Sequence, residues 1–127
     1  MSTKILLMIT AINGFAAVAL GAFGAHGLKN KISENLMSAY QTAVQYHFYH
    51  TLALFGLVLL MFHFGQKGVL QVSAGLFLLG ILLFCGSLYG LALGGPTWLG
   101  PITPIGGLAF LAAWAALLFA AFKLHEV

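Results

Sequence analysis

Residues 70–93 read LQVSAGLFLLGILLFCGSLYGLAL, and this stretch contains no charged side chain. An α-helix rises about 1.5 Å per residue, so about 20 apolar residues cross the hydrocarbon core of a bilayer, which is about 30 Å thick. The stretch is therefore long enough to span a membrane as one helix. Three others have the same character, namely 5–24, 47–64 and 105–122. The sequence predicts an all-α, polytopic membrane protein built as a four-transmembrane-helix bundle.

The overall composition supports this class of protein. Hydrophobic residues make up 61% of the 127 residues and charged residues 6%, whereas about a quarter of a soluble domain is charged. Four spans and their turns use nearly the whole chain, so we expect a single transmembrane domain over residues 1–127. The five lysines are isolated and there is no arginine, while nucleic-acid binding needs a basic stripe. The expected partner is the lipid bilayer and not nucleic acid.

Helix boundaries can be predicted at two places. Apolar positions recur at helical spacing from Leu36 onward, so the second helix should start near residue 36, before its span, with Ser33 as its N-cap. The stretch from residue 94 to residue 107 holds all three prolines of the chain. Since proline lacks a backbone donor and fixes φ, we expect an ordered interfacial loop there and not a continuous helix.

The lysines also predict an orientation. With four spans, Lys4, Lys67 and Lys123 lie on one side of the membrane, and Lys29 and Lys31 lie on the other. Cytoplasmic loops carry the excess of lysine and arginine in membrane proteins. The count of three against two favours a multi-pass protein of the plasma membrane, or bacterial inner membrane, with both termini in the cytoplasm.

Small residues recur at every fourth position in three of the spans. Lipid tails are as apolar as leucine, so helices in membranes associate through close backbone packing and hydrogen bonds. We expect the small-residue faces to bring neighbouring helices together, or to form a homo-oligomer or a contact with a larger membrane complex. The faces are Ala17, Gly21 and Ala25; Gly86, Gly90 and Gly94; and Ala112, Ala116 and Ala120.

One candidate polar network stands out, and most of it belongs to the second helix. At about 100° per residue, His47 and His50 fall on nearly the same face, one turn apart. Asn13 lies midway through the first span, where its amide must find a partner on a facing helix. The candidate residues are Asn13, His26, Tyr40, Gln41, Gln45, Tyr46, His47, His50 and Thr51.

This network has two interpretations. Histidine within a span is costly unless partnered, so His47 and His50, with His26 near the same membrane surface, are candidates for binding metal or haem, handling a small ligand or relaying a proton. Alternatively, the side chains anchor the helix at headgroup depth or bond neighbouring helices. No carboxylate is close enough in sequence to complete a carboxylate-rich metal site, and Cys85 reads as a buried, inert thiol.

The sequence contains no pattern typical of catalysis. It has no nucleophile–base pair, no phosphate-binding loop and no paired carboxylates. We therefore expect no enzymatic activity and no resident cofactor. The favoured interpretation is a structural or accessory scaffold, and the alternative is a small membrane protein that handles a ligand, a metal, haem or a proton through the second helix.

Four segments together resemble a known family. They are GAFGAHGL (21–28), YQTAVQYHFYH (40–50), LLFCGSLY (82–89) and ITPIGG (102–107). They are similar to the YgdD/YwdK family of small bacterial inner-membrane proteins, and the likeness extends over essentially the whole chain. The resemblance implies a four-span plasma-membrane protein. It implies no activity, because the family is one of unknown function without established catalytic or ligand-binding residues.

Overall fold

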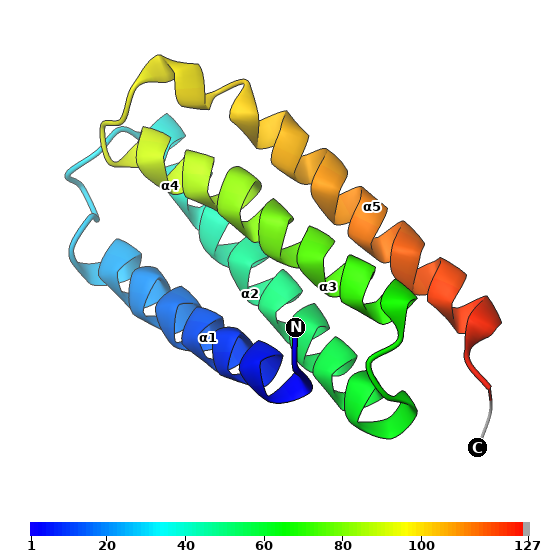
Figure 1. Cartoon of the computed structure of the whole chain (residues 1–127). Coiled ribbons are helices and arrows are strands. Elements are labelled where there is room, and N and C mark those ends of the chain that lie inside the picture. The colour runs from blue at the N-terminus through cyan, green and yellow to red at the C-terminus, as the bar shows by residue number, and fades with distance from the viewer. Residues whose placement is uncertain (126–127) are drawn as a thin grey trace.

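A computed structural model describes residues 1–125 of the chain (Figure 1). In this range the regular structure is helical and contains no strand, which confirms the predicted all-α class. Helical stretches of 24, 31, 25 and 27 residues are long and apolar enough to cross a membrane. In chain order the elements are α1 (Thr3–His26), α2 (Glu34–Phe64), α3 (Gly68–Gly80), the π-helix η1 (Ile81–Cys85), α4 (Gly86–Ala92), the short 3-10 helix η2 (Thr97–Leu99) and α5 (Ile102–Lys123).

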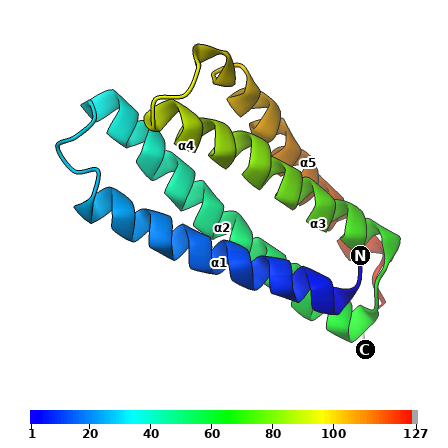
Figure 2. The same ribbon diagram turned by 60° about the vertical axis from the view of Figure 1, so that its left-hand side comes forward.

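The spans are arranged in an open order and not as a closed square. In the described part of the chain, the backbone of α1 approaches only that of α2, and α5 packs on the third span, formed by α3, η1 and α4. Helix α2 lies between, against α1 on one side and the third span on the other. Figures 1 and 2 show this order from two directions, with the start of α1 and the end of α5 at the same end of the bundle. Antiparallel spans of even number require this placement.

Local signals explain where the first two helices begin and where the second ends. The Oγ atom of Ser2 accepts a hydrogen bond from the backbone N–H of Ile5 at 3.1 Å, and Ser33 does the same for Leu36 at 3.2 Å. The prediction of Ser33 as an N-cap is confirmed, and α2 begins directly after it, slightly earlier than expected. Gly65 ends α2 with a φ of +88°, a conformation that favours glycine.

The prediction of a loop from residue 94 to residue 107 is wrong for the second half of that stretch. Helix α5 begins at Ile102 and includes Pro104, whereas the fourth span was expected from residue 105. Proline is accommodated in the first turn because the N–H groups there have no acceptor within the helix. The first half is irregular apart from η2, and its Trp98 is exposed at the end of the bundle.

Close packing between α5 and the third span occurs at glycines outside the predicted faces. A Cβ at Gly106 would overlap the backbone of Phe84, and a Cβ at Gly80 would overlap the ring of Phe110. By contrast, a Cβ at Gly86 would meet nothing within 4 Å. On the glycine face predicted for the third span, Gly90 is closely approached, but by Leu99 of η2 and not by another span. A regular spacing defines a face without defining its neighbour.

The other two small-residue faces are realised in part. On α1, Ala17 is buried and a Cβ at Gly21 would lie 3.3 Å from Val44 of α2. On α5 the buried alanines include Ala113 and Ala120, while Ala112 is exposed. The packed face of α5 is thus rotated from the predicted one.

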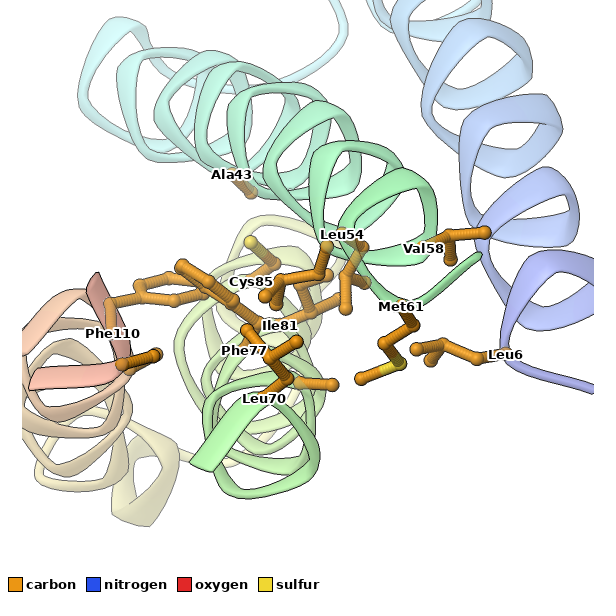
Figure 3. Packing of buried hydrophobic residues seen from close by; sticks show 14 residues of the cluster. Leu6, Ala43, Leu54, Val58, Met61, Leu70, Phe77, Ile81, Cys85 and Phe110 are labelled. Carbon is orange, nitrogen blue, oxygen red and sulfur yellow. The ribbon is translucent and has the colours of Figure 1, made fainter. Parts of the chain in front are cut away.

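The apolar core lies between α2, the third span and α5, with a contribution from α1 (Figure 3). Leu54, Phe77 and Cys85 are fully buried, and Leu6 of α1 points toward Met61 of α2. The burial predicted for Cys85 is confirmed. Large apolar side chains also cover the outside of the helices. This apolar exterior suits a hydrocarbon environment.

Candidate functional site

Three polar side chains from three spans form a hydrogen-bonded chain inside the bundle. The Nε2 atom of His47 (α2) lies 2.9 Å from Oδ1 of Asn13 (α1), and its Nδ1 atom lies 3.0 Å from the hydroxyl of Tyr89 (α4). Asn13 is close to the midpoint of α1, and His47 is only 5% exposed. The structure thus gives Asn13 the partner on a facing helix that its position requires.

The neighbouring hydrogen bonds assign the protons of His47. The Nδ2 atom of Asn13 donates to the carbonyl of Ile9 at 2.9 Å, so Oδ1 is left as an acceptor. A neutral His47 then carries its hydrogen on Nε2 and accepts a hydrogen bond from Tyr89 at Nδ1. Both ring nitrogens have partners in the neutral form.

His50 also has partners for both ring nitrogens, but as the opposite tautomer. Its Nδ1 atom donates to the carbonyl of Tyr46 at 2.8 Å, and its Nε2 atom accepts from the indole N–H of Trp114 (α5) at 3.2 Å. Its ring stacks on Phe110, with 3.7 Å between the centroids and 11° between the planes. His50 therefore ties α2 to α5, a pair whose backbones do not come close.

The three candidate metal ligands do not converge. His47 is directed toward α1 and α4, whereas His50 is directed toward α5, although the two residues are one turn apart. His26 is exposed at the far end of α1. Within residues 1–125, no group of three or more histidine, cysteine, aspartate or glutamate side chains is placed to hold a metal ion.

Tyr40 and Thr51 are the remaining buried members of the candidate network. The hydroxyl of Tyr40 donates to the carbonyl of Leu20 on α1, and its ring lies edge-on to Tyr89 at 5.4 Å. A Cβ at Gly24 would overlap the Tyr40 ring, so a glycine is required for this approach. Thr51 donates to the carbonyl of His47 at 2.6 Å within α2.

Two interhelical hydrogen bonds were not predicted from the sequence. Ser73 of α3 donates to the carbonyl of Ala113 on α5 at 2.8 Å. The hydroxyls of Ser87 and Thr103 lie 2.5 Å apart. Each serine lies within an apolar span, where a hydroxyl needs a partner, and this was the available signal. Ser87 also donates to the carbonyl of Phe84 at 3.0 Å.

The polar candidates of α2 that are exposed line two grooves. The first, of about 430 Å³, follows the α1–α2 contact, and Gln41 and Gln45 lie on it opposite Gly21 and Gly24. The second, of about 450 Å³, lies between α2 and α5 over η1, and both Tyr46 and His50 line it. We call the second one the aromatic groove. His47 and His50 are both buried, and Tyr46 is the polar side chain exposed on the aromatic groove.

These features define a class: a small four-span membrane protein whose helices are joined by buried, neutral hydrogen bonds. The sequence profile of a family described as "Protein of unknown function (DUF423)" matches residues 20–107. The chain belongs to this family. No solved structure matches the chain.

Named relatives agree with this assignment. The chain is 43% identical to the UPF0382 membrane protein YwdK of Bacillus subtilis over 120 residues, which cover 94% of this chain and 98% of YwdK. It is 42% identical to the UPF0382 inner membrane protein YgdD of Escherichia coli over 129 residues, which cover 99% of this chain and 95% of YgdD. The resemblance to the YgdD/YwdK family and the prediction of a membrane protein are confirmed.

Proposed function

We propose that this protein is a non-catalytic scaffold or accessory protein of the plasma membrane. The observation that supports this proposal most strongly is the hydrogen bonding of the two central histidines. Both ring nitrogens of His47 and both of His50 already have partners, and those partners belong to other helices or to the backbone of α2. Such bonds fix one arrangement of helices in lipid, where apolar side chains alone do not drive association.

The same bonds speak against metal, haem or proton handling by these histidines. A metal binds the free lone pair of a neutral imidazole nitrogen. In His47 that lone pair accepts from Tyr89, and in His50 it accepts from Trp114. On the α1 side the hydrogen-bonded chain through His47 ends at the backbone carbonyl of Ile9, which cannot accept a proton onward. Coordination or proton transfer would first have to break a bond between helices.

The α1–α2 groove is the surface through which we propose that the scaffold meets its partner. Gln41 and Gln45 are exposed there, and within residues 1–125 their side chains have no hydrogen-bond partner. Their amides are free to bond a donor or an acceptor on another chain, and such bonds between helices help membrane proteins to associate. Gly21 and Gly24 form the other wall, where they already pack against Val44 and Tyr40 of α2, so the exposed amides are the part of the groove that is left for a partner. A second copy, or a subunit of a larger membrane complex, fits this chemistry.

The orientation is part of the same proposal. Lys4, Lys67 and Lys123 lie at the end of the bundle where α1 starts and α5 ends, while Lys29 and Lys31 lie at the other end. The excess of lysine at the first end supports a cytoplasmic location for both termini. Labelling of single cysteines introduced at Lys67 and Lys29, in a Cys85→Ala background, tests this. Protection of position 67 and labelling of position 29 in intact cells is the expected result.

One experiment tests the structural role of the histidines directly. The purified protein and its His47→Ala/His50→Ala variant are compared by absorption spectroscopy and metal analysis. The proposal predicts a colourless protein without stoichiometric metal, and a variant that differs only in stability. Stoichiometric haem or metal in the wild type, lost in the variant, would make α2 a cofactor site and overturn the proposal.

A second experiment tests the partner surface. A photo-crosslinking amino acid replaces Gln45 in the α1–α2 groove or, as a control, Leu59, which is exposed on α2 away from the groove lining. Protein adducts from position 45 and none from position 59 are expected in native membranes. Their mass separates a second copy from another subunit. Equal yields at both positions, or no protein adduct at either, would contradict a docking surface here.

Handling of a small ligand remains as a second candidate function, and one observation favours it. Tyr46 and His50 line the aromatic groove, which opens on the outside of the bundle. This groove is separate from the α1–α2 groove and from the hydrogen-bonded chain through His47.

A further inference from the structure

The aromatic groove has the size and composition of a small-molecule site. Its volume is about 450 Å³, within the range of about 300–1,000 Å³ found for ligand pockets, which are mostly apolar and aromatic with a few polar groups. Within the described chain no charged side chain lines it. The lining residues come from α2, η1 and α5, and they are Tyr46, His50, Phe84, Pro104, Gly107, Leu108, Phe110, Leu111 and Trp114.

Aromatic rings from three elements surround this space. The centroid of Tyr46 lies 4.7 Å from that of Phe84, and Phe84 lies 5.6 Å from Phe110. Phe84 belongs to the π-helix, whose wider turn departs from the regular helical path. Short π-helical segments within α-helices are frequently found at functional sites. The rings offer several faces and edges to a flat, conjugated molecule.

The groove also contains a free hydrogen-bond donor. Tyr46 is 38% exposed, and its hydroxyl has no hydrogen-bond partner among residues 1–125. By contrast, Tyr40 donates to the carbonyl of Leu20 on α1, and Tyr89 donates to Nδ1 of His47 on α2. The hydroxyl of Tyr46 is therefore available to donate to a bound molecule. The absence of charged residues from the groove lining favours a neutral acceptor such as a carbonyl.

We propose that the aromatic groove binds the headgroup of a membrane-dissolved quinone, a flat, neutral, conjugated ring with carbonyl acceptors. The ring lies against Phe84 and the exposed Trp114, and one carbonyl accepts from the hydroxyl of Tyr46. Exposed Leu108 and Leu111 form the outer edge of the groove, so the ligand enters sideways from the bilayer. This proposal goes beyond the scaffold function and does not depend on it.

Trp114 provides the signal for a binding test. The chain has two tryptophans, so a Trp98→Phe protein keeps only the one that lines the groove. This protein, in lipid nanodiscs, is titrated with menadione, a naphthoquinone, and the Trp114 emission is followed with correction for absorption. Binding predicts quenching that saturates. A Trp114→Phe protein, which retains Trp98 outside the groove, should show only the linear quenching of random collisions.

Two matched glycines separate binding in the groove from general effects. A Cβ at Gly107 would lie 3.8 Å from Phe84, an ordinary contact, so Gly107→Leu fills the groove without moving the backbone. A Cβ at Gly56 would meet nothing within 4 Å, and Gly56 does not line the groove, so Gly56→Leu is the control. Gly107→Leu should abolish the saturable quenching, and Gly56→Leu should retain it.

Tyr46→Phe tests the hydrogen bond without changing the shape of the groove. Removal of one hydrogen bond is expected to weaken menadione binding about fivefold, and to leave the binding of 2-methylnaphthalene, which has no carbonyl, unchanged. Linear quenching of equal slope in all variants would overturn the proposal. It would leave the scaffold proposal intact, because the adducts at position 45 arise in a different groove.

Discussion

His47 and His50 are one turn apart on α2, yet their surroundings differ. His47 is enclosed between α1 and α4, and its partners Asn13 and Tyr89 are side chains of those helices. His50 lies beside the aromatic groove, and its partners are a backbone carbonyl of its own helix and the indole of Trp114. In the first case each hydrogen bond joins two helices. In the second, one bond is local and the other lies at the edge of an open space.

Two histidines at neighbouring positions of one helix can thus have different roles in a membrane protein. A histidine whose two ring nitrogens both form hydrogen bonds to other spans holds those helices together within the bundle. A histidine at a groove is also satisfied, but its neighbour Tyr46 keeps a donor for a molecule from outside the chain. Stability should therefore depend more on His47, and ligand binding more on the region of His50.

The largest expected effect separates the two histidines directly. His47→Ala removes two interhelical hydrogen bonds, leaves Oδ1 of Asn13 and the hydroxyl of Tyr89 without partners and opens a cavity. It should therefore lower the free energy of unfolding by about 3 kcal/mol. His50→Ala should cost about 1.5 kcal/mol, because the adjoining groove lets neighbouring side chains relax. Unfolding in mixed micelles of increasing SDS fraction measures both. A larger loss for His50→Ala would contradict the claim that stability depends more on His47.

A second prediction concerns the packing that brings α5 to the aromatic groove. Gly106→Leu should force α5 away from η1, because its Cβ overlaps the Phe84 backbone, at a cost of about 2 kcal/mol. Gly86→Leu is the matched control, and it should be close to neutral because the space around that Cβ is open. The same SDS unfolding assay applies. Equal losses for the two variants would contradict the assigned contact.

The smallest expected effects come from single donors. Tyr89→Phe leaves Nδ1 of His47 without a donor inside the bundle and should cost about 1 kcal/mol. Trp114→Phe removes the donor to Nε2 of His50 and should cost about 0.5 kcal/mol, since this hydrogen bond is the longer of the two, at 3.2 Å against 3.0 Å. A double-mutant cycle of each with its histidine gives the two coupling energies. A stronger His50–Trp114 coupling would contradict the claim that the hydrogen bonds of His47 contribute more to stability.

Much of the fold could be predicted from the sequence because it depends on local properties. Uncharged stretches of span length predict the four helices, and Ser33 marks the start of α2 through a bond within its first turn. The start of α5 at Ile102 was missed, because proline suggests a break although it is acceptable in a first turn. The π-helix from residue 81 to residue 85 has no corresponding sequence pattern.

The residues of the candidate site could be predicted from the sequence, but their hydrogen-bond partners could not. Asn13 and His47 were expected to need partners, since polar groups in a span require them. Which partner each finds depends on how the helices are rotated, and their spacing in sequence gives no information about rotation. The placement of His47 and His50 on one face suggested a shared site, but the 60° between them is enough to direct one toward α1 and the other toward α5.

Nitrogen-15 NMR of the histidine rings, in protein labelled on histidine and held in nanodiscs, tests the central claim most directly. The account predicts two neutral imidazoles of opposite tautomer, one protonated on Nε2 and absent from His47→Ala, the other protonated on Nδ1 and absent from His50→Ala. A charged imidazolium at either position, the same tautomer at both, or nitrogen shifts typical of metal coordination would contradict the assignment of these histidines to fixed hydrogen bonds between helices.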